Sequence, residues 1–323
     1  MLRPRHHDRG ACHDAGPAQQ RGTPTPAPLR PRTARPSRAG RPDRAPPGHA
    51  RMSAARPKVT VPSLQAMKTA GEKSVCFVAW DYQMAQLADR AGAEIISVGD
   101  TVGVNLWGQP HPLEITMDEL LVVAKAVRRG VRRALLSVDF PFGPLQSGSA
   151  AAVEAAIRLV KEAGVDMVKL DGASDYPEAV EAITRAGIPV FAQFGITPQT
   201  SLKYGIDYSA ASTAQLPDEM LSALVIEAER LEEAGAVALN FTNSGPVVGP
   251  PVVEAVGIPV LGGFGGGPWL DGRIRMVTAA IGYDAVNVDR DPDTYANVAK
   301  IAYDALVECA ADVRGARKLR GQK

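Results

Sequence analysis

Histidine is scarce in the part of this 323-residue chain that has the composition of a folded domain. Four of its five histidines lie within the first 51 residues (His6, His7, His13 and His49), which leaves His111 alone in the remainder. A zinc site built on histidine and a Ser-His-Asp triad therefore have almost nothing to be built from. The composition excludes both classes of site.

Cysteine is equally rare, and long apolar runs are missing. The three cysteines, Cys12, Cys76 and Cys309, form no C-x-x-C pair, so neither a structural zinc site nor a disulfide framework is indicated. This usage predicts a reducing compartment, and we expect the cytoplasm. No apolar run reaches the roughly 20 residues that cross a bilayer. No G-x-G-x-x-G follows the first apolar run, which argues against a dinucleotide site there.

The first 51 residues contain almost no large apolar side chains. They hold 11 Arg, no Lys and 3 Asp, a formal charge of +8, and are rich in Pro, Ala and Gly. Such a segment buries too little surface to offset its ordering entropy. We expect residues 1–56 to be a disordered leader, with Met52 as the working start. A transit peptide or a basic arm for nucleic acid are the alternatives, but the amphipathic pattern of the first and the aromatic residues of the second are lacking.

From residue 57 to 323 short apolar runs alternate with Ala-rich amphipathic stretches. Several stretches end in Gly just before an apolar run, as in RAGAEI, EAGVDM and EAGAVA, which is typical of a helix that leads into a strand. Eight such units in about 270 residues predict a single-domain (β/α)8 TIM barrel, with a doubly wound open sheet as the alternative. The expected strands are Val75–Val78, Glu94–Val98, Ala134–Val138, Met167–Leu170, Val190–Gln193, Val237–Phe241, Val260–Leu261 and Ala285–Val288. The expected helices include Gly272–Ile281 and a last one over about Pro292–Val313.

Three aspartates follow successive predicted strands of this barrel. Asp100, Asp139 and Asp171 come at the ends of the second, third and fourth strands, where barrel enzymes carry their chemistry. Oxygen ligands without His or Cys suit Mg²⁺, so we predict that these three bind the metal, although an Asp there can also cap the next helix. Lys169 lies on the same strand face as Asp171, and we expect it to neutralise a substrate carboxylate or a developing enolate.

The later strand ends carry neutral side chains and glycine. Gln193 ends the fifth strand, Asn240, Thr242 and Asn243 belong to the sixth, and Asp289 follows the expected eighth. After the seventh strand comes the run GGFGGG at residues 262–267. This run is either a cradle for a phosphate or a set of tight turns, and the residues alone leave both open.

Several segments resemble the ketopantoate hydroxymethyltransferase family of the phosphoenolpyruvate/pyruvate barrel superfamily. The likeness covers roughly residues 60–290 and is carried by WDYQMAQLADRAG, VGDTVGVNLWGQ, VDFPFG, AGVDMVKLDG, IPVFAQFGITPQ and GIPVLGGFGGG. It implies a Mg²⁺-dependent transferase of pantothenate biosynthesis that moves a hydroxymethyl group from 5,10-methylenetetrahydrofolate to a 2-oxo acid. The family reaction turns 3-methyl-2-oxobutanoate into ketopantoate through a metal-stabilised enolate.

The resemblance also assigns roles and partners. Asp100 and Asp139 match the family's metal-binding aspartates, and Thr101 stands at a substrate-contacting Ser. Lys169 matches the lysine on the substrate carboxylate, and Asp171 replaces a Glu near the metal's waters. The partners implied are the oxo acid, the folate and further copies of the chain in a decamer-like ring, with no nucleic acid and no membrane.

Two departures from the family bear on catalysis. Thr242 stands at the place of the catalytic Glu, and Gln193 replaces a His and cannot titrate near neutral pH. Losing a general base costs about 10²–10⁴-fold in rate. Three interpretations follow: a divergent hydroxymethyltransferase, an aldolase- or lyase-type enzyme acting on another 2-oxo or β-keto acid in a specialised pathway, or a catalytically impaired binding homologue.

Overall fold

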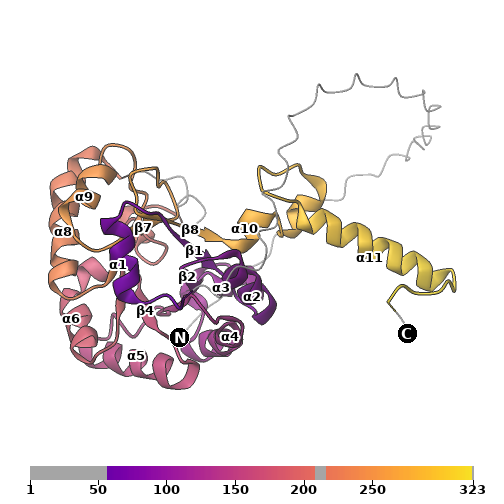
Figure 1. Cartoon of the computed structure of the whole chain (residues 1–323), viewed down its shortest axis with the longest axis horizontal. Coiled ribbons are helices and arrows are strands. Elements are labelled where there is room, and N and C mark those ends of the chain that lie inside the picture. The colour runs from indigo at the N-terminus through magenta and orange to yellow at the C-terminus, as the bar shows by residue number, and fades with distance from the viewer. Residues whose placement is uncertain (1–56, 208–215, 322–323) are drawn as a thin grey trace, which may run out of the picture. The chain divides into compact units, whose positions relative to one another are not determined.

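Eight parallel strands close into a barrel in the order β1 to β8, and β8 pairs back with β1. The computed structural model describes residues 57–207 and 216–321 (Figure 1). The leader prediction for residues 1–56, including the start at Met52, lies outside these residues. The closed barrel confirms the predicted (β/α)8 fold and rules out the open sheet. Its strands are β1 Ser74–Val78, β2 Ile95–Val98, β3 Leu135–Asp139, β4 Met167–Leu170, β5 Val190–Gly195, β6 Ala238–Thr242, β7 Val260–Gly262 and β8 Gly272–Met276.

Helices connect the strands on the outside of the barrel (Figure 1). The α-helices are α1 Val61–Thr69, α2 Tyr82–Ala91, α3 Val102–Trp107, α4 Met117–Gly130, α5 Ser149–Ala163, α6 Pro177–Arg185, α8 Leu221–Glu233, α9 Gly249–Ala255, α10 Val277–Ile281 and α11 Val298–Arg314. Short 3-10 turns are η1 Pro112–Glu114, η2 Ala173–Asp175, η3 Ser201–Tyr204, η4 Asp218–Met220 and η5 Ala285–Asp289.

The helix boundaries follow from local chemistry. Asp81 caps α2 by accepting a hydrogen bond from the Met84 amide at 2.8 Å. Gly92 and Gly164 end α2 and α5 with φ of 100° and 64°, the left-handed conformation that glycine adopts without steric cost. The Gly-before-strand signal therefore located real helix ends.

The eighth strand is not where the sequence placed it. Residues 285–288, predicted as a strand, form part of η5, and Gly272–Met276, predicted as the start of a helix, is β8. Only Val277–Ile281 of that expected helix is helical. The error has a physical cause: β8 alternates, with Arg273 and Arg275 exposed, whereas barrel strands are expected to be apolar on both faces.

The outer face of β8 and of its neighbour β1 is poorly covered. Val75 of β1 is 38% exposed, and the helix after β8, α10, has only five residues. The last helix, α11, begins later than expected and is exposed along almost its whole length (Figure 1). Its apolar residues Ile301 and Leu306 are 65% and 69% exposed.

The barrel interior changes from apolar to polar toward the carboxyl ends of the strands. An apolar cluster of Cys76, Ile95, Leu135, Met167, Phe191, Ala238 and Leu261 fills the amino-terminal part, where Leu64 of α1 packs against it. One layer higher the buried inward positions include Ser97, Ser137, Lys169, Gln193 and Asn240. The fold therefore rests on an apolar plug and places polar side chains above it. Within the described ranges, no helix combines the length and the apolar character of a membrane span.

Candidate active site

A cavity of about 160 Å³ opens at the carboxyl ends of the strands. Most of the residues singled out in the sequence line it: Asp100, Thr101, Asp139, Lys169, Asp171, Gln193, Asn240 and Thr242. These side chains come from the ends of five strands, β2 to β6, which span about 140 positions of the chain from Asp100 to Thr242. The barrel therefore brings nearly all of the predicted site together.

Two sequence candidates lie elsewhere. Asp289 belongs to η5, so its predicted place at the cavity mouth was wrong because the eighth strand was misplaced. Asn243 adopts a φ of 61° and donates from Nδ2 to the Ile196 carbonyl at 3.1 Å. It supports the loop after β6 and does not line the cavity.

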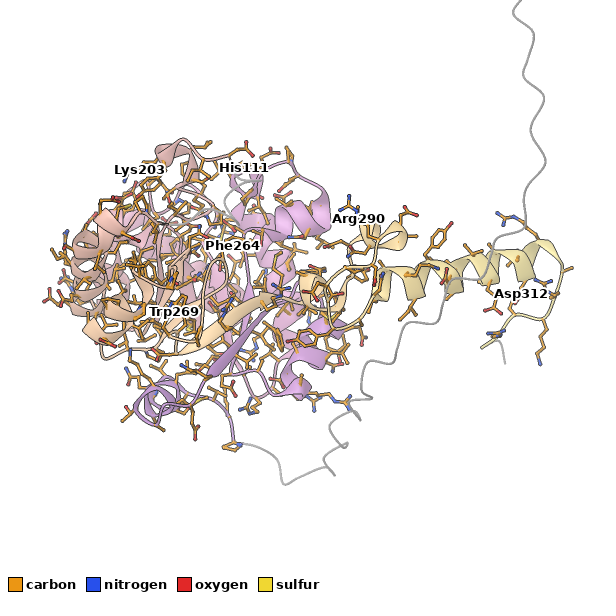
Figure 2. All side chains as sticks on the ribbon, turned by 90° about the horizontal axis from the view of Figure 1, so that it is seen from above. His111, Lys203, Phe264, Trp269, Arg290 and Asp312 are labelled. Atoms are coloured by element: carbon orange, nitrogen blue, oxygen red, sulfur yellow. The ribbon has the colours of Figure 1, made fainter. Side chains whose placement is uncertain are left out.

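The glycine run after β7 is closely packed. A Cβ on Gly265 would lie 2.9 Å from Cα of Asn243. The Arg273 guanidinium donates to the carbonyls of Gly263 and Gly266. Close packing therefore explains why glycine stands at these positions, without a need for a phosphate cradle. Phe264, labelled in Figure 2, also lines the cavity from this loop.

A buried ion pair forms the centre of one side of the cavity. Nζ of Lys169 lies 2.8 Å from Oδ2 of Asp139, and the two side chains are 8% and 4% exposed. The register places these residues directly opposite each other on β3 and β4. Asp100 and Asp171, both 2% exposed, stand at the neighbouring strand ends.

None of the three aspartates is a helix cap. The residues at the starts of α3 and α5 are Thr101 and Gly148, and η2 starts after Gly172. Asp81, by contrast, is a cap. Helix capping therefore does not explain why Asp100, Asp139 and Asp171 are buried at the strand ends.

Gln199 connects the carboxylates and was not singled out as a site residue. Its Nε2 donates to Oδ2 of Asp100 at 2.8 Å and to the Phe140 carbonyl at 3.1 Å, while its amide donates to Oδ2 of Asp171 at 3.4 Å. The residue is part of the TPQ segment quoted for the resemblance. Only the fold shows that the loop after β5 reaches across to β2.

Burial and the charges of neighbouring residues shift the pKa values of Asp100, Asp171 and Lys169. Burial, with the charges of Asp139 and Asp171, raises the pKa of Asp100 to about 8. Burial raises the pKa of Asp171 to about 6, against the lowering effect of Lys169 and of the Thr197 hydroxyl. Burial alone would lower the pKa of Lys169, but the surrounding carboxylates raise it above its ordinary value. The lysine is therefore a fixed cation.

We call the side of the cavity that is formed by Asp100, Asp139, Lys169 and Asp171 the acidic side. Its carboxylates fit a hard divalent cation. Oδ1 of Asp139 and Oδ1 of Asp171 are buried and accept no hydrogen bond from the described residues, and carboxylate oxygens are preferred Mg²⁺ ligands. Across residues 57–207 and 216–321, no three His, Cys, Asp or Glu side chains converge on one point closely enough to hold an ion. Two aspartates completed by substrate oxygens and water match the way Mg²⁺ is commonly bound. A direct bond from Asp171 stays a prediction.

The β5 and β6 side of the cavity, which we call the neutral side, carries uncharged side chains. Nε2 of Gln193 on β5 donates to Oγ1 of Thr242 on β6 at 3.3 Å. Asn240 lies beside Gln193 in the β5–β6 register. Ile274, Arg275 and Met276 of β8 also line the cavity. None of the three was predicted from the sequence, because the strand that carries them was read as a helix.

A closed (β/α)8 barrel with buried aspartates and a lysine at its strand ends defines a barrel enzyme. The chain belongs to the ketopantoate hydroxymethyltransferase family, whose sequence profile matches residues 58–317. This result confirms the resemblance seen in the sequence.

Named relatives support the same assignment. The chain is 36% identical over 258 residues to the 3-methyl-2-oxobutanoate hydroxymethyltransferase of Salinibacter ruber, covering 80% of this chain and 96% of that protein. It is also 36% identical over 262 residues to the protein of the same name from a Cyanothece species, covering 79% and 96%.

Solved structures share the fold at low identity. Phosphonopyruvate hydrolase in complex with oxalate and Mg²⁺ aligns with a TM-score of 0.52 and 15% identity, covering 79% of this chain and 87% of that one. A 2,3-dimethylmalate lyase aligns with a TM-score of 0.50 and 14% identity, covering 79% and 88%. These two similarities concern the fold alone.

Proposed function

We propose that this protein transfers a hydroxymethyl group from 5,10-methylenetetrahydrofolate to a 2-oxo acid, converting 3-methyl-2-oxobutanoate to ketopantoate with Mg²⁺. The observation that carries the proposal is the buried Lys169–Asp139 pair between Asp100 and Asp171 in a cavity sized for a small acid. The names of the relatives support a hydroxymethyltransferase.

Each side chain of the acidic side has a role in binding. Asp100 and Asp139 hold the metal, and bound Mg²⁺ would supply Lewis acidity toward the keto oxygen. Lys169 neutralises the carboxylate of the oxo acid, since its charge is buried and held by Asp139. Thr101 lines the cavity beside Asp100 and contacts the same ligand through its hydroxyl.

Removal of the C3 proton needs a base, and the neutral side offers none. Among the described residues that line the cavity, Asp171 is the carboxylate left after Asp100 and Asp139 are assigned to the metal. We assign it the C3 proton, directly or through a water. Gln193 and Thr242 orient the reacting groups by hydrogen bonds and take up no proton at neutral pH.

Incubation of the purified protein with Mg²⁺, 3-methyl-2-oxobutanoate and methylenetetrahydrofolate tests this function. Ketopantoate should appear, detected by mass spectrometry, and the Asp139→Asn variant should form none. No product from the wild-type protein, under conditions where a relative is active, would overturn the proposal.

The neutral side supports a second candidate, an aldolase- or lyase-type reaction on another 2-oxo or β-keto acid. A substrate that enolises readily or loses CO₂ does not need a glutamate base at position 242. Screening 2-oxo acids for Mg²⁺-dependent exchange of C3 hydrogens in D₂O separates the candidates by the acid that exchanges fastest. A catalytically impaired binding homologue would bind an oxo acid in calorimetry and exchange none.

We also propose that the protein is a homo-oligomer whose contacts include α11. Two exposed surfaces support this proposal. The helix α11 exposes Ile301, Leu306 and Val313, and the outer face of β1 and β8 is followed only by the five-residue helix α10. The α11 helix of one copy could cover this outer face in another copy. Deleting residues 298–321 should lower the mass in multi-angle light scattering, and an unchanged mass would contradict it. Cys76 and Cys309 are free thiols, in accord with the proposed cytoplasmic location.

A further inference from the structure

The part of the cavity lining that lies across the barrel from Lys169 is apolar. It consists of four residues, which we call the apolar side: Val78 of β1, Ile274 and Met276 of β8, and Ala279 of α10. In the closed order of eight strands, β4 and β8 are four steps apart in either direction. The apolar side is therefore opposite the strand that carries Lys169.

The strand register fixes which side chains of β8 point inward. Ile274 packs against the apolar cluster at the amino-terminal end of the barrel, and Met276, two residues further along, lies on the same face of the strand. Met276 also pairs with Val78 of β1. The exposed Arg275 between them alternates to the outer face. Ile274 therefore forms the deep end of the apolar side, and Met276 with Val78 forms the part nearer the mouth.

The acidic side fixes the direction of a bound oxo acid. In the function proposed above, Lys169 holds the carboxylate, and Asp100 and Asp139 hold the metal at the keto oxygen. The carbon chain beyond C2 then extends away from strands β2 to β4. An alkyl group is stabilised by burial against hydrocarbon, whereas it would desolvate the amides of the neutral side. The apolar side is therefore the favourable place for the alkyl group.

Met276 is held in place by a neighbouring side chain. Nδ2 of Asn105 on α3 lies 3.7 Å from the sulfur of Met276, and it also donates to the Thr101 carbonyl at 2.8 Å. Methionine is otherwise a flexible side chain that adapts to the space beside it. The contact with Asn105 restricts this adaptation, because the bond to Thr101 fixes Asn105 in turn. Met276 therefore forms a defined wall.

We infer that Met276 is a specificity-determining residue that limits the length of the alkyl chain of the oxo acid. The inference rests on the proposed function, because it takes the carboxylate and the keto group to be bound on the acidic side. A cavity of about 160 Å³ has to hold the metal, its waters and the acid, so space for the alkyl group is restricted. The two methyl groups of 3-methyl-2-oxobutanoate fit beside Val78 and Ile274, and an acid one carbon longer is rejected by Met276.

Calorimetric binding in the presence of Mg²⁺ tests this limit. One methylene in an apolar pocket changes discrimination about 10–200-fold, and 3-methyl-2-oxobutanoate and 3-methyl-2-oxopentanoate differ by one methylene. We expect the wild-type protein to bind the shorter acid at least tenfold more tightly. Met276→Ala should bind the two acids within threefold or prefer the longer one. Affinities within threefold in the wild type, or an unaltered preference in Met276→Ala, would overturn the inference.

Two further variants locate the alkyl group. Ala279→Leu fills the apolar side from α10, so 3-methyl-2-oxobutanoate should bind at least tenfold more weakly while pyruvate, which has no C4, binds within threefold of the wild type. Equal losses for these two acids would place the alkyl group elsewhere and overturn the inference.

Asn105→Leu removes the donor to the sulfur at nearly constant side-chain size. The ratio of the two affinities is the readout, because loss of the bond to the Thr101 carbonyl affects both acids alike. We expect the preference for the shorter acid to fall about threefold. A ratio equal to that of the wild type would overturn the positioning role of Asn105. Circular dichroism establishes that each variant is folded.

Met84→Ala is the matched control for Met276→Ala. Met84 of α2 is half-buried like Met276, packs against the core and lies outside the cavity lining. The control should keep the wild-type preference. A loss of preference as large as that in Met276→Ala would mean that loosened packing is responsible, which overturns the inference. Failure of every 2-oxo acid to bind the wild-type protein would instead count against the proposed function itself.

Discussion

The two sides of the cavity handle buried polarity in opposite ways. On strands β2 to β4, charges are paired or connected, as Asp139 is to Lys169 and Asp100 is to Gln199. On strands β5 and β6, Gln193, Asn240 and Thr242 carry no charge, and the amide carbonyls of Gln193 and Asn240 accept no hydrogen bond from the residues that the structure describes. Charge holds and polarises a ligand at long range, whereas neutral dipoles discriminate at contact. We therefore expect changes on the first side to affect ligand binding more strongly than changes on the second.

The largest effect should follow from removing the cation of the acidic side. Lys169→Met leaves Asp139 buried without its partner, which costs about 3–5 kcal/mol of unfolding free energy. The same change should lower kcat/KM about 10²–10³-fold, because the oxo acid loses its counter-charge. Urea denaturation and steady-state kinetics measure the two effects.

Lys203→Met is the matched control, since Lys203 pairs with Asp175 at 2.9 Å between side chains that are 57% and 44% exposed. Exposed pairs contribute less than about 1 kcal/mol. Equal losses of unfolding free energy in the two variants would show that burial does not make the Lys169–Asp139 pair more important for stability than an exposed pair.

The second prediction puts a charge on the neutral side. Thr242→Glu supplies a carboxylate at the position that the sequence resemblance assigns to a catalytic Glu, and a general base contributes about 10²–10⁴-fold. We expect exchange of the C3 hydrogens of 3-methyl-2-oxobutanoate in D₂O to accelerate about 10²-fold, followed by NMR. Thr242→Gln, similar in size and neutral, should give no gain, and equal rates in the two variants would refute the assignment.

The third prediction loosens the connection between the carboxylates. Gln199→Leu removes the donor to Asp100 at 2.8 Å, and loss of a supporting hydrogen bond typically weakens metal binding about 10–100-fold. We expect the Mg²⁺ dissociation constant to rise about tenfold in calorimetry. Gln83→Leu, at an exposed position of α2, should leave it unchanged, and an unaltered constant in Gln199→Leu would remove the positioning role.

The smallest effect concerns pH. The pKa of Asp100 is raised to about 8 by burial and neighbouring carboxylates, so the folded protein binds more protons than the unfolded chain between about pH 4 and 8. Stability of the metal-free protein should therefore fall as pH rises through this window. We expect a loss of about 1 kcal/mol or more between pH 5 and 8 in urea denaturation.

Asp100→Asn should flatten this profile, because an amide has no charge to desolvate. Mg²⁺ added at pH 8 should restore stability to the wild-type protein by binding the folded state. A profile that is as steep in Asp100→Asn as in the wild type would assign the pH dependence to other groups.

Sequence patterns identified most of the fold because the local signals were strong. Gly92 and Gly164 mark helix ends that propensity and backbone sterics determine within a few residues. β8 was misread because its outward Arg273 and Arg275 face solvent, so its pattern depends on what covers the strand and not on the strand itself. Asp289 was assigned to the mouth through the same error.

The acidic residues of the site were visible because charge at a buried strand end is rare, and Asp100, Asp139, Lys169 and Asp171 all lie where their positions predicted. The neutral side chains of β5 and β6 were only partly visible. Gln193 was predicted to replace a family His, and that stays a prediction, whereas its place beside Asn240 depends on the register between β5 and β6. Gln199 belongs to a loop whose reach across the barrel leaves no local signal.

The sequence by itself determined the barrel, the family and the charged residues of the site, because hydrophobic periodicity, glycine punctuation and buried charge are properties of short segments. Only the tertiary structure decided that Gln199 connects Asp100 to Asp171, that the eighth strand is Gly272–Met276, and that Gln193 lies beside Asn240 across β5 and β6. These features arise from the register of strands around a closed barrel, from the reach of the loop after β5 and from what covers the outer face of β8. Which side chains meet there is set by pairings between residues that are far apart in the chain.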